Sequence, residues 1–391
     1  MDFTNDICIV GGAGHVGLPL GLAFADKGHS VLLYDLDVEV LKKIEQGKMP
    51  FVEHDAEPVL IEVLNKTLFL TSEIGDVASA RFVIVTIGTP VDEHLNPRLR
   101  ALLELFDTLR PHLDPAQTII IRSTVYPHTC KQIAQRLNSK GNGPWHVAYC
   151  PERIAQGYAL RELKELPQLV AGLTDKALAD AAQLFASIAP KVIRLTMEEA
   201  EMAKLFTNAW RYIQFAVANQ FYMIASSFGV DFNQVRKAIV DGYGRAHSLP
   251  SAGFAAGPCL LKDTLQLAAF NNNNFMLGHA AMMVNEGLPY LLVQDLKRSY
   301  PLSEMSVGIL GMAFKPNNDD PRSSLSYKLR KVLLLECRQV LCTDPFVPDP
   351  DLLPLAEVLD RADLLIVGTP HDCYKGLRFK QPVIDVTNSI K

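Results

Sequence analysis

The chain has 391 residues, of which 48% are hydrophobic and 21% charged, and its formal net charge at pH 7 is −5. These values are typical of a globular protein of two or three domains. The sequence has no basic stripe, so neither nucleic acid nor an anionic membrane is an expected partner. The N-terminus lacks a signal-peptide pattern, no apolar stretch could span a bilayer, and the seven cysteines form no Cys-x-x-Cys pair. We therefore expect a cytoplasmic protein with free thiols and no metal site.

The first elements predicted are a buried strand at 7–10, a helix at 18–27 and a second strand at 30–34. Between the first strand and the helix, Gly12, Gly14 and Gly17 have the G-x-G-x-x-G spacing of a dinucleotide-binding loop. Asp35 ends the second strand, where an acid binds the ribose hydroxyls and repels a 2′-phosphate. This context favours NAD over NADP, whereas a glycine turn with an exposed aspartate is the simpler alternative.

Two further strands are expected at 82–86 and 118–122. Thr89, which precedes Pro90, and Thr124 follow their carboxyl ends, where open α/β sheets bind ligands. Each threonine is placed to meet a cofactor, but each could instead be only a turn hydroxyl. After a short strand at 147–149, Glu152 could face the same cleft, although a single surface glutamate is more often solvated.

A long helix is predicted at 198–228, with Lys204, Asn208 and Arg211 on one face. Such residues are either an exposed polar stripe or a site. A second helical stretch runs over 263–300, with breaks expected at 271–274 and at Pro289. These helices carry more apolar surface than one hairpin can bury, which indicates a helical middle domain that also forms a dimer interface.

Cys259 follows the turn signal Gly257-Pro258 and is expected in the first turn of a helix, with Asp263 one turn further on. Free N–H groups and the helix dipole favour a thiolate at such a position, so Cys259 is a candidate nucleophile with a carboxylate beside it. A lone cysteine is, however, often only a small buried residue.

The C-terminal part repeats the pattern of the N-terminal part, with strands expected at 307–311, 340–344, 362–370 and 383–387. The loop that begins at Gly311 lacks the later glycines of the dinucleotide-binding motif. This favours binding of a mononucleotide over a dinucleotide. Lys315 and Arg322 supply charge for phosphates, or are ordinary solvated cations. The predicted fold is α/β, with two Rossmann-like parallel-sheet domains (1–196 and 302–391) joined by a central helical domain (197–301).

Taken together, these motifs resemble the UDP-glucose/GDP-mannose dehydrogenase family over essentially the whole chain. The resemblance implies three sets of site residues. The catalytic set is Cys259, Lys204, Asn208, Asp263, Thr124 and Glu152. The cofactor-binding set, for NAD, is Gly12, Gly14, Val16, Gly17, Asp35, Thr89, Thr124, Lys262 and Arg322. The substrate-binding set is Glu152, Lys204, Asn208, Arg211, Arg245, Gly257 and Lys315, with Arg245 reaching the neighbouring site in a homodimer.

The resemblance also implies an activity: four-electron oxidation of the C6 alcohol of a nucleotide sugar to the uronic acid, through a Cys259 thioester. Two features depart from the family pattern, Ala255-Ala256 in place of a glycine pair and Gln156 in place of a second glutamate. The sugar, a UDP-hexose or a UDP-N-acetylhexosamine, stays open. The alternatives are a two-electron dehydrogenase of the 6-phosphogluconate type and a catalytically silent nucleotide-sugar sensor.

Overall fold

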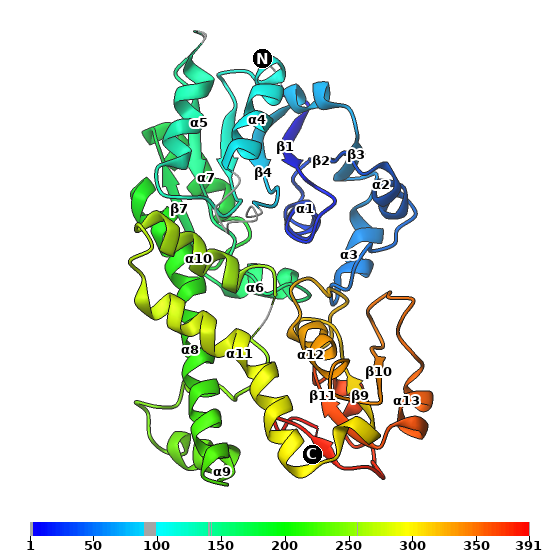
Figure 1. Cartoon of the computed structure of the whole chain (residues 1–391). Coiled ribbons are helices and arrows are strands. Elements are labelled where there is room, and N and C mark those ends of the chain that lie inside the picture. The colour runs from blue at the N-terminus through cyan, green and yellow to red at the C-terminus, as the bar shows by residue number, and fades with distance from the viewer. Residues whose placement is uncertain (1–2, 90–98, 140, 142, 256, 391) are drawn as a thin grey trace. The chain divides into compact units, whose positions relative to one another are not determined.

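The computed structural model describes residues 3–89, 99–139, 141, 143–255 and 257–390. Pro90 and Ala256, which belong to the motifs above, lie outside the described residues. The chain forms two compact units, Met1–Phe206 and Thr207–Lys391, which are described one at a time (Figure 1). The two boundaries of the three domains proposed from the sequence, at 196/197 and 301/302, stay a prediction.

An eight-stranded sheet with the order β3-β2-β1-β4-β5-β6-β7-β8 forms the centre of the first unit. The strand pairs are parallel except that β7 runs antiparallel to β6. Its strands are β1 (Asn5–Val10), β2 (Val31–Tyr34), β3 (Leu68–Thr71), β4 (Ala80–Val85), β5 (Thr118–Ile121), β6 (His146–Tyr149), β7 (Gln168–Gly172) and β8 (Val192–Arg194). The five strands predicted for this region are confirmed, and the carboxyl ends of β1, β2, β4 and β5 share one edge.

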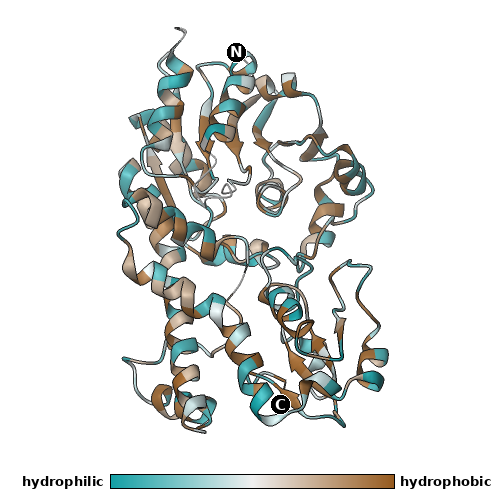
Figure 2. Cartoon of the chain, in the orientation of Figure 1, coloured by the Kyte–Doolittle hydropathy of each residue, from teal (hydrophilic) through white to brown (hydrophobic). Residues whose placement is uncertain are grey.

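Helices cover both faces of this sheet, and alternate side chains of each strand point to opposite faces. Ile7 and Ile9 of β1 pack in one core, whereas Cys8 and Val10 pack in the other. The first core includes α1 (Gly17–Asp26), α2 (Val38–Glu45), α3 (Ala56–Val63), α6 (Ala159–Glu165) and α7 (Asp175–Phe185). The second includes α4 (Leu99–Leu109) and α5 (Thr129–Asn138). Because both faces are covered, the strands are mostly apolar, as their brown colour in Figure 2 shows.

The predicted long helix is α8 (Met197–Ser227), which contains the boundary between the two units. It is followed by the shorter α9 (Phe232–Val240). No helix in the described part of the chain is long and apolar enough to cross a membrane.

The predicted break at 271–274 is confirmed, because α10 (Leu260–Phe270) ends there and α11 (Met276–Ser299) begins after it. Asn272 and Asn273 adopt φ values of 53° and 59°, a left-handed conformation that asparagine tolerates better than most residues.

The predicted break at Pro289 is wrong, since α11 continues through it. A proline inside a helix removes one backbone hydrogen bond, here the one to the carbonyl of Asn285. Packing offsets that loss, because Leu288 and Pro289 are buried. The Asn285 side chain also donates to the backbone carbonyl of Tyr212 at 3.1 Å, which fixes the same turn.

The second unit contains the predicted smaller parallel sheet, with the order β10-β9-β11-β12. Its strands are β9 (Ser306–Leu310), β10 (Gln339–Thr343), β11 (Leu364–Val367) and β12 (Val383–Ile384). α12 (Leu325–Leu333) and α11 pack on one face of the sheet, and α13 (Leu355–Arg361) packs on the other. One mostly parallel sheet, one wholly parallel sheet and the helical segment between them confirm the predicted α/β fold class.

Candidate functional site

The loop between β1 and α1 needs its glycines for steric reasons. A Cβ on Gly12 would lie 2.8 Å from the Leu33 Cβ, and a Cβ on Gly17 would lie 2.3 Å from the Gly11 carbonyl oxygen. The positive φ of the turn falls on Gly11, at 79°, a position that the motif alone did not single out. Both distances are far below contact, so the loop keeps this close packing only with glycine at 12 and 17.

Gly14 differs, because a Cβ there would meet only the Gly11 carbonyl oxygen, at 3.5 Å. Its glycine is therefore not required by the protein's own packing, which fits a place where a ligand approaches the backbone. Val16 is the N-cap of α1 and makes no side-chain cap, and the first turn carries no acidic residue. A helix N-terminus that carries neither a side-chain cap nor an acidic residue suits a pyrophosphate, so these residues fit a dinucleotide.

Asp35 follows β2 and is only partly buried. Its Oδ2 accepts the backbone N–H of Ala13 in the glycine loop at 2.9 Å, and its Oδ1 accepts that of Asp37 at 3.1 Å. A carboxylate has about four acceptor positions, so these two bonds leave capacity for the two hydroxyls of a ribose.

Thr89 and Thr124 lie side by side after β4 and β5. The Thr89 hydroxyl donates to the Thr124 carbonyl at 2.8 Å, and the Ser123 hydroxyl donates to the carbonyl of Ile87 at 2.6 Å. The Thr89 hydroxyl therefore joins two turns, as a turn hydroxyl would. It also lies at the sheet edge where a cofactor is expected, so both interpretations of Thr89 remain open. Thr124 is partly buried there.

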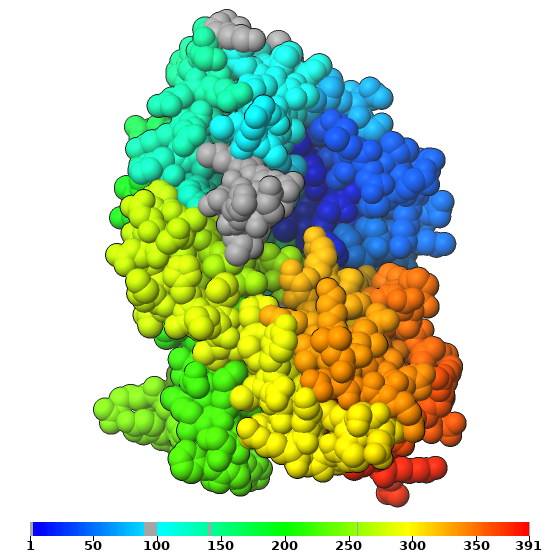
Figure 3. Space-filling view, viewed as in Figure 1, coloured from blue at the N-terminus to red at the C-terminus, as the bar shows by residue number. Residues whose placement is uncertain are grey.

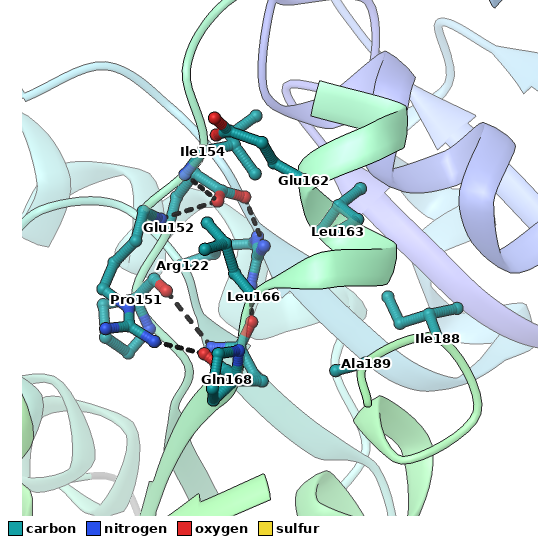
Figure 4. A pocket seen from close by; sticks show the side chains of 12 residues that line it. Arg122, Pro151, Glu152, Ile154, Glu162, Leu163, Leu166, Gln168, Ile188 and Ala189 are labelled. Carbon is teal, nitrogen blue, oxygen red and sulfur yellow. Dashed lines mark hydrogen bonds and ion pairs between the residues drawn. The ribbon is translucent and has the colours of Figure 1, made fainter. Parts of the chain in front are cut away.

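Glu152 is not a solvated surface glutamate, although that is the more common expectation for a single glutamate at this place. Its Oε1 accepts the backbone N–H groups of Arg153 at 2.6 Å and Ile154 at 2.8 Å, and its Oε2 forms an ion pair with Arg122. Figure 4 shows this pair in a small pocket, with Gln168 beside it. Because both oxygens are already engaged, Glu152 holds the 152–154 turn and is poorly placed to act as a base.

Arg122 is the residue that the sequence reasoning missed here. It is 1% exposed, and its Nη1 donates to the Cys150 carbonyl at 3.1 Å and to the Gln168 Oε1 at 3.0 Å. A signal was present, because an arginine that ends a buried apolar strand needs an anionic partner in the fold.

The polar face of α8 divides into buried and exposed parts. Lys204 is 7% and Asn208 5% exposed, whereas Arg211 is exposed. Lys204 and Asn208 therefore do not belong to an exposed polar stripe, which is what composition alone would favour. The Asn208 Nδ2 donates to the Asp263 Oδ2 at 2.5 Å.

Asp263 lies on α10 and is completely buried. Besides Asn208, it is paired with Lys262, whose Nζ lies 2.8 Å from the Asp263 Oδ1. A buried carboxylate needs such partners to remain ionised.

Cys259 is exposed and is the N-cap residue of α10, one position before the first turn in which it was predicted. Its carbonyl accepts the backbone N–H of Asp263 at 2.8 Å. Arg322 interacts electrostatically with Cys259, and hydrogen bonds to Asp320 are the main cause that raises the pKa of Arg322. These bonds join Nε to Oδ1 at 2.9 Å and Nη2 to Oδ2 at 2.6 Å, so Asp320 fixes the position of this permanent cation.

The remaining predicted substrate residues are spread over the second unit. Gly257 has φ of 110°, and a Cβ on it would lie 2.6 Å from the ring of Phe314, so only glycine fits there. The Lys315 Nζ lies 5.8 Å from the centre of the same ring. Arg245 is exposed, with its guanidinium 5.1 Å from the ring of Tyr243.

The smaller sheet has its own counterpart of Asp35, which is Asp344 after β10. Its Oδ2 accepts the backbone N–H groups of Met312 at 2.6 Å and Ala313 at 2.9 Å, much as Asp35 accepts that of Ala13. The His371 Nε2 also donates to this oxygen at 2.9 Å, because its Nδ1 accepts the N–H of Asn317. Asp344 and His371 are both fully buried, so this aspartate is closed to a ribose.

Comparison with known proteins covers nearly the whole chain. Three models of the UDP-glucose/GDP-mannose dehydrogenase family match: the NAD binding domain at residues 5–189, the central domain at 198–287 and the UDP binding domain at 308–391.

Individual relatives agree with these matches. A UDP-N-acetyl-D-mannosamine dehydrogenase of Pyrococcus horikoshii is 30% identical over 97% of this chain and 95% of its own length. A UDP-glucose 6-dehydrogenase of Haloferax volcanii is 27% identical over 94% and 91%. The solved structure of a UDP-D-ManNAc dehydrogenase from Pyrococcus horikoshii superposes with a TM-score of 0.90 at 28% identity, covering 99% of this chain and 96% of that one. The chain therefore belongs to the UDP-glucose/GDP-mannose dehydrogenase family and is an NAD-dependent nucleotide-sugar dehydrogenase.

Proposed function

We propose that this enzyme oxidises the C6 alcohol of a UDP-sugar to the carboxylate in two steps, with Cys259 as the covalent nucleophile. The observation that carries the proposal is the exposed thiol at the N-terminus of α10, with a buried carboxylate one turn away and an electrostatic interaction with the Arg322 cation. A helix N-terminus and a cation both favour the thiolate form of cysteine. A two-electron alcohol dehydrogenase has no use for such a thiol.

The glycine loop fits NAD, and we assign its binding to Gly12, Gly14, Val16, Gly17 and Asp35, with Thr89 and Thr124 at the neighbouring strand ends. Lys262 and Arg322 keep their assignment to the cofactor through the family resemblance alone, since each is held by an aspartate of its own unit. Bound NAD accepts the hydride in each of the two oxidations.

In the first oxidation C6 loses a hydride and the hydroxyl loses a proton, which gives the aldehyde. We assign the proton to a water bound by Asp263, whose carboxylate is fixed by Asn208 and Lys262. Thr124 keeps the place in this proton-transfer step that the family resemblance implies for it. The Cys259 sulfur then adds to the aldehyde carbon, and loss of a second hydride from this thiohemiacetal gives the thioester. Water hydrolyses the thioester, which releases the carboxylate and the thiol.

Lys204 and Asn208 are assigned to the alkoxide and the tetrahedral oxyanions, because buried donors stabilise such charge most strongly. Asp263 also activates the hydrolytic water. We prefer it to Glu152, whose two oxygens are occupied by Arg122 and by backbone N–H groups.

The preferred substrate class is a UDP-N-acetylhexosamine, with a UDP-hexose as the second candidate. The relative that is 30% identical is a UDP-N-acetyl-D-mannosamine dehydrogenase, and the one at 27% is a UDP-glucose 6-dehydrogenase. We also propose the domain boundaries at 196/197 and 301/302 and a reducing, cytoplasmic location, which suits seven free cysteines.

The test is a panel of UDP- and GDP-sugars, with NADH counted per sugar consumed. We expect two NADH per sugar, and the highest kcat/KM for a UDP-N-acetylhexosamine. One NADH per sugar indicates the two-electron alternative instead. Binding of NAD and a UDP-sugar without NADH formation indicates a silent sensor.

Cofactor choice is expected to depend on Asp35. We predict that NAD is used far better than NADP, and that Asp35→Ala weakens NAD binding by about 1–3 kcal/mol, the cost of a lost charge-assisted hydrogen bond. Isothermal titration with NAD and with NADP measures both quantities.

Asp35→Asn is the matched control, because it keeps an oxygen for the N–H of Ala13 but removes the charge. It should recover part of the NAD affinity and relax the discrimination against NADP. Equal use of NADP and NAD by the unmodified enzyme contradicts the assignment.

A homodimer is proposed from the exposed apolar face of α8. Val217, Phe221 and Ile224 follow helical spacing and are 40%, 45% and 49% exposed. Figure 3 shows the green surface of α8 and the segment after it open to solvent in one chain. Monomers rarely expose such a contiguous stripe, and Arg245 beyond it would reach a second copy.

Phe221→Glu combined with Ile224→Glu is expected to convert the dimer into a monomer, because the change places two charges on this stripe. Light scattering measures the mass, and Gln220→Glu, an exposed position on the same helix, should leave it unchanged. An unmodified enzyme that is fully active as a monomer at assay concentration would rule the dimer out.

A further inference from the structure

Glu201 is a buried carboxylate that the mechanism above does not use. It lies on α8 and is completely buried. Its Oε2 accepts the backbone N–H of His128 at 2.7 Å and its Oε1 accepts that of Cys130 at 3.0 Å. These N–H groups belong to the start of α5, where His128 is the N-cap residue and makes no side-chain cap of its own.

The two N–H groups at the N-terminus of α5 are thus bonded by a residue that is far away in the sequence. A serine or aspartate at the N-cap would accept the same N–H groups locally and near water. The carboxylate of Glu201 is more than seventy residues away in the sequence, and its burial raises its pKa, so the ionised form is costly here. The two long-range bonds fix the position of α8 against α5, which a local cap cannot do.

The two elements that Glu201 joins each carry an assigned reaction residue. On α8, Lys204 follows Glu201 by one helical turn and is also buried. On the other side, the turn that contains Thr124 leads through residues 125–128 into α5, which begins at Thr129. That turn is held at its start by the Ser123 hydroxyl bond to Ile87 and the Thr89 hydroxyl bond to Thr124. Glu201 fixes its other end.

We propose that Glu201 is a positioning residue that sets Lys204 relative to Thr124. The proposal rests on the roles assigned above to those two residues. Reacting groups on different elements must be held closely, and a displacement of about 1 Å far from the chemistry can cost about 10²-fold in rate. Glu201 meets that need through two bonds that end on backbone N–H groups, which cannot rotate away.

The experiment uses Glu201→Gln in the full-length enzyme. Glutamine has the same length but presents an NH₂ group to one of the two N–H donors, so one bond is lost. We expect kcat to fall by about 10- to 100-fold, with the KM for the sugar within about threefold, since Glu201 does not bind the sugar. Hydrogen–deuterium exchange should become faster in the segment 123–130.

Two controls separate positioning from plain stability. Glu53 is also a buried glutamate, and it accepts the backbone N–H groups of Gly157 at 2.9 Å and Ala159 at 2.6 Å at the start of α6. Glu198 joins the same pair of helices as Glu201, through Lys131, but at the surface. Glu53→Gln should lose as much thermal stability as Glu201→Gln while keeping kcat within about threefold, and Glu198→Gln should change neither.

The proposal fails if kcat of Glu201→Gln falls no further than that of Glu53→Gln, or if KM rises while kcat stays unchanged. If the glutamine variant does not fold, Glu201→Asp serves in the same comparison, because it keeps the charge and is one methylene too short to reach both N–H groups. Failure of the proposed function is a separate result, since it shows as a missing second NADH in the unmodified enzyme.

Discussion

Replacement of Cys259 by alanine is expected to stop uronate formation, with a loss of several orders of magnitude in the overall rate. Without the thiol no thiohemiacetal or thioester forms, so the reaction ends at the aldehyde. The reverse of the first half-reaction, aldehyde plus NADH to alcohol, needs no thiol and should largely survive. The measurement is the ratio of aldehyde reduction to aldehyde oxidation in the purified variant.

The chain supplies its own control for this prediction. Cys373 is also an exposed, free cysteine, and no role is assigned to it. Cys373→Ala should therefore keep both half-reactions. If the ratio in Cys259→Ala equals that of the unmodified enzyme, the thiol is not the nucleophile and the four-electron mechanism is wrong.

Lys204→Met is expected to lower kcat by about 10²–10³, the usual effect of removing one preorganised donor to a developing oxyanion. Methionine keeps much of the apolar stem and removes only the charged end, so the helix should remain packed. Steady-state kinetics with saturating NAD gives kcat, and thermal unfolding checks the fold.

Lys164→Met is the comparison variant, because that lysine on α6 is exposed and has no assigned role. Its kcat should equal that of the unmodified enzyme. A rise in KM for the sugar with unchanged kcat in Lys204→Met would mean that Lys204 binds the substrate equally in the ground and transition states, against the role assigned to it.

Local patterns allowed much of the fold to be predicted. Gly12, Gly14 and Gly17 stand between a strand and a helix as expected, and the asparagines at 271–274 do end a helix. Pro289 misled, because local propensity cannot register the packing that keeps α11 continuous.

The site residues show the same division. The place of Cys259 at a helix start followed from local sequence, whereas its exposure did not. The ion pair of Glu152 with Arg122 did not follow from local sequence, since Arg122 comes directly after β5 and Glu152 comes after β6. The bonds of Glu201 to α5 could not be foreseen either. Such pairings depend on which elements the fold brings together, and no periodicity in one sequence encodes them.

The buried Asp344 explains how an enzyme with two similar sheets keeps the second sheet from binding NAD as well. Its two oxygens accept four backbone N–H groups and one imidazole N–H, those of Met312, Ala313, Phe346, Val347 and His371. No acceptor capacity remains for an adenosine ribose, so restoring the missing glycines after Gly311 would not create a second NAD site. The two sheets are therefore not interchangeable, and an engineer who wished the second one to bind NAD would have to remove His371 first.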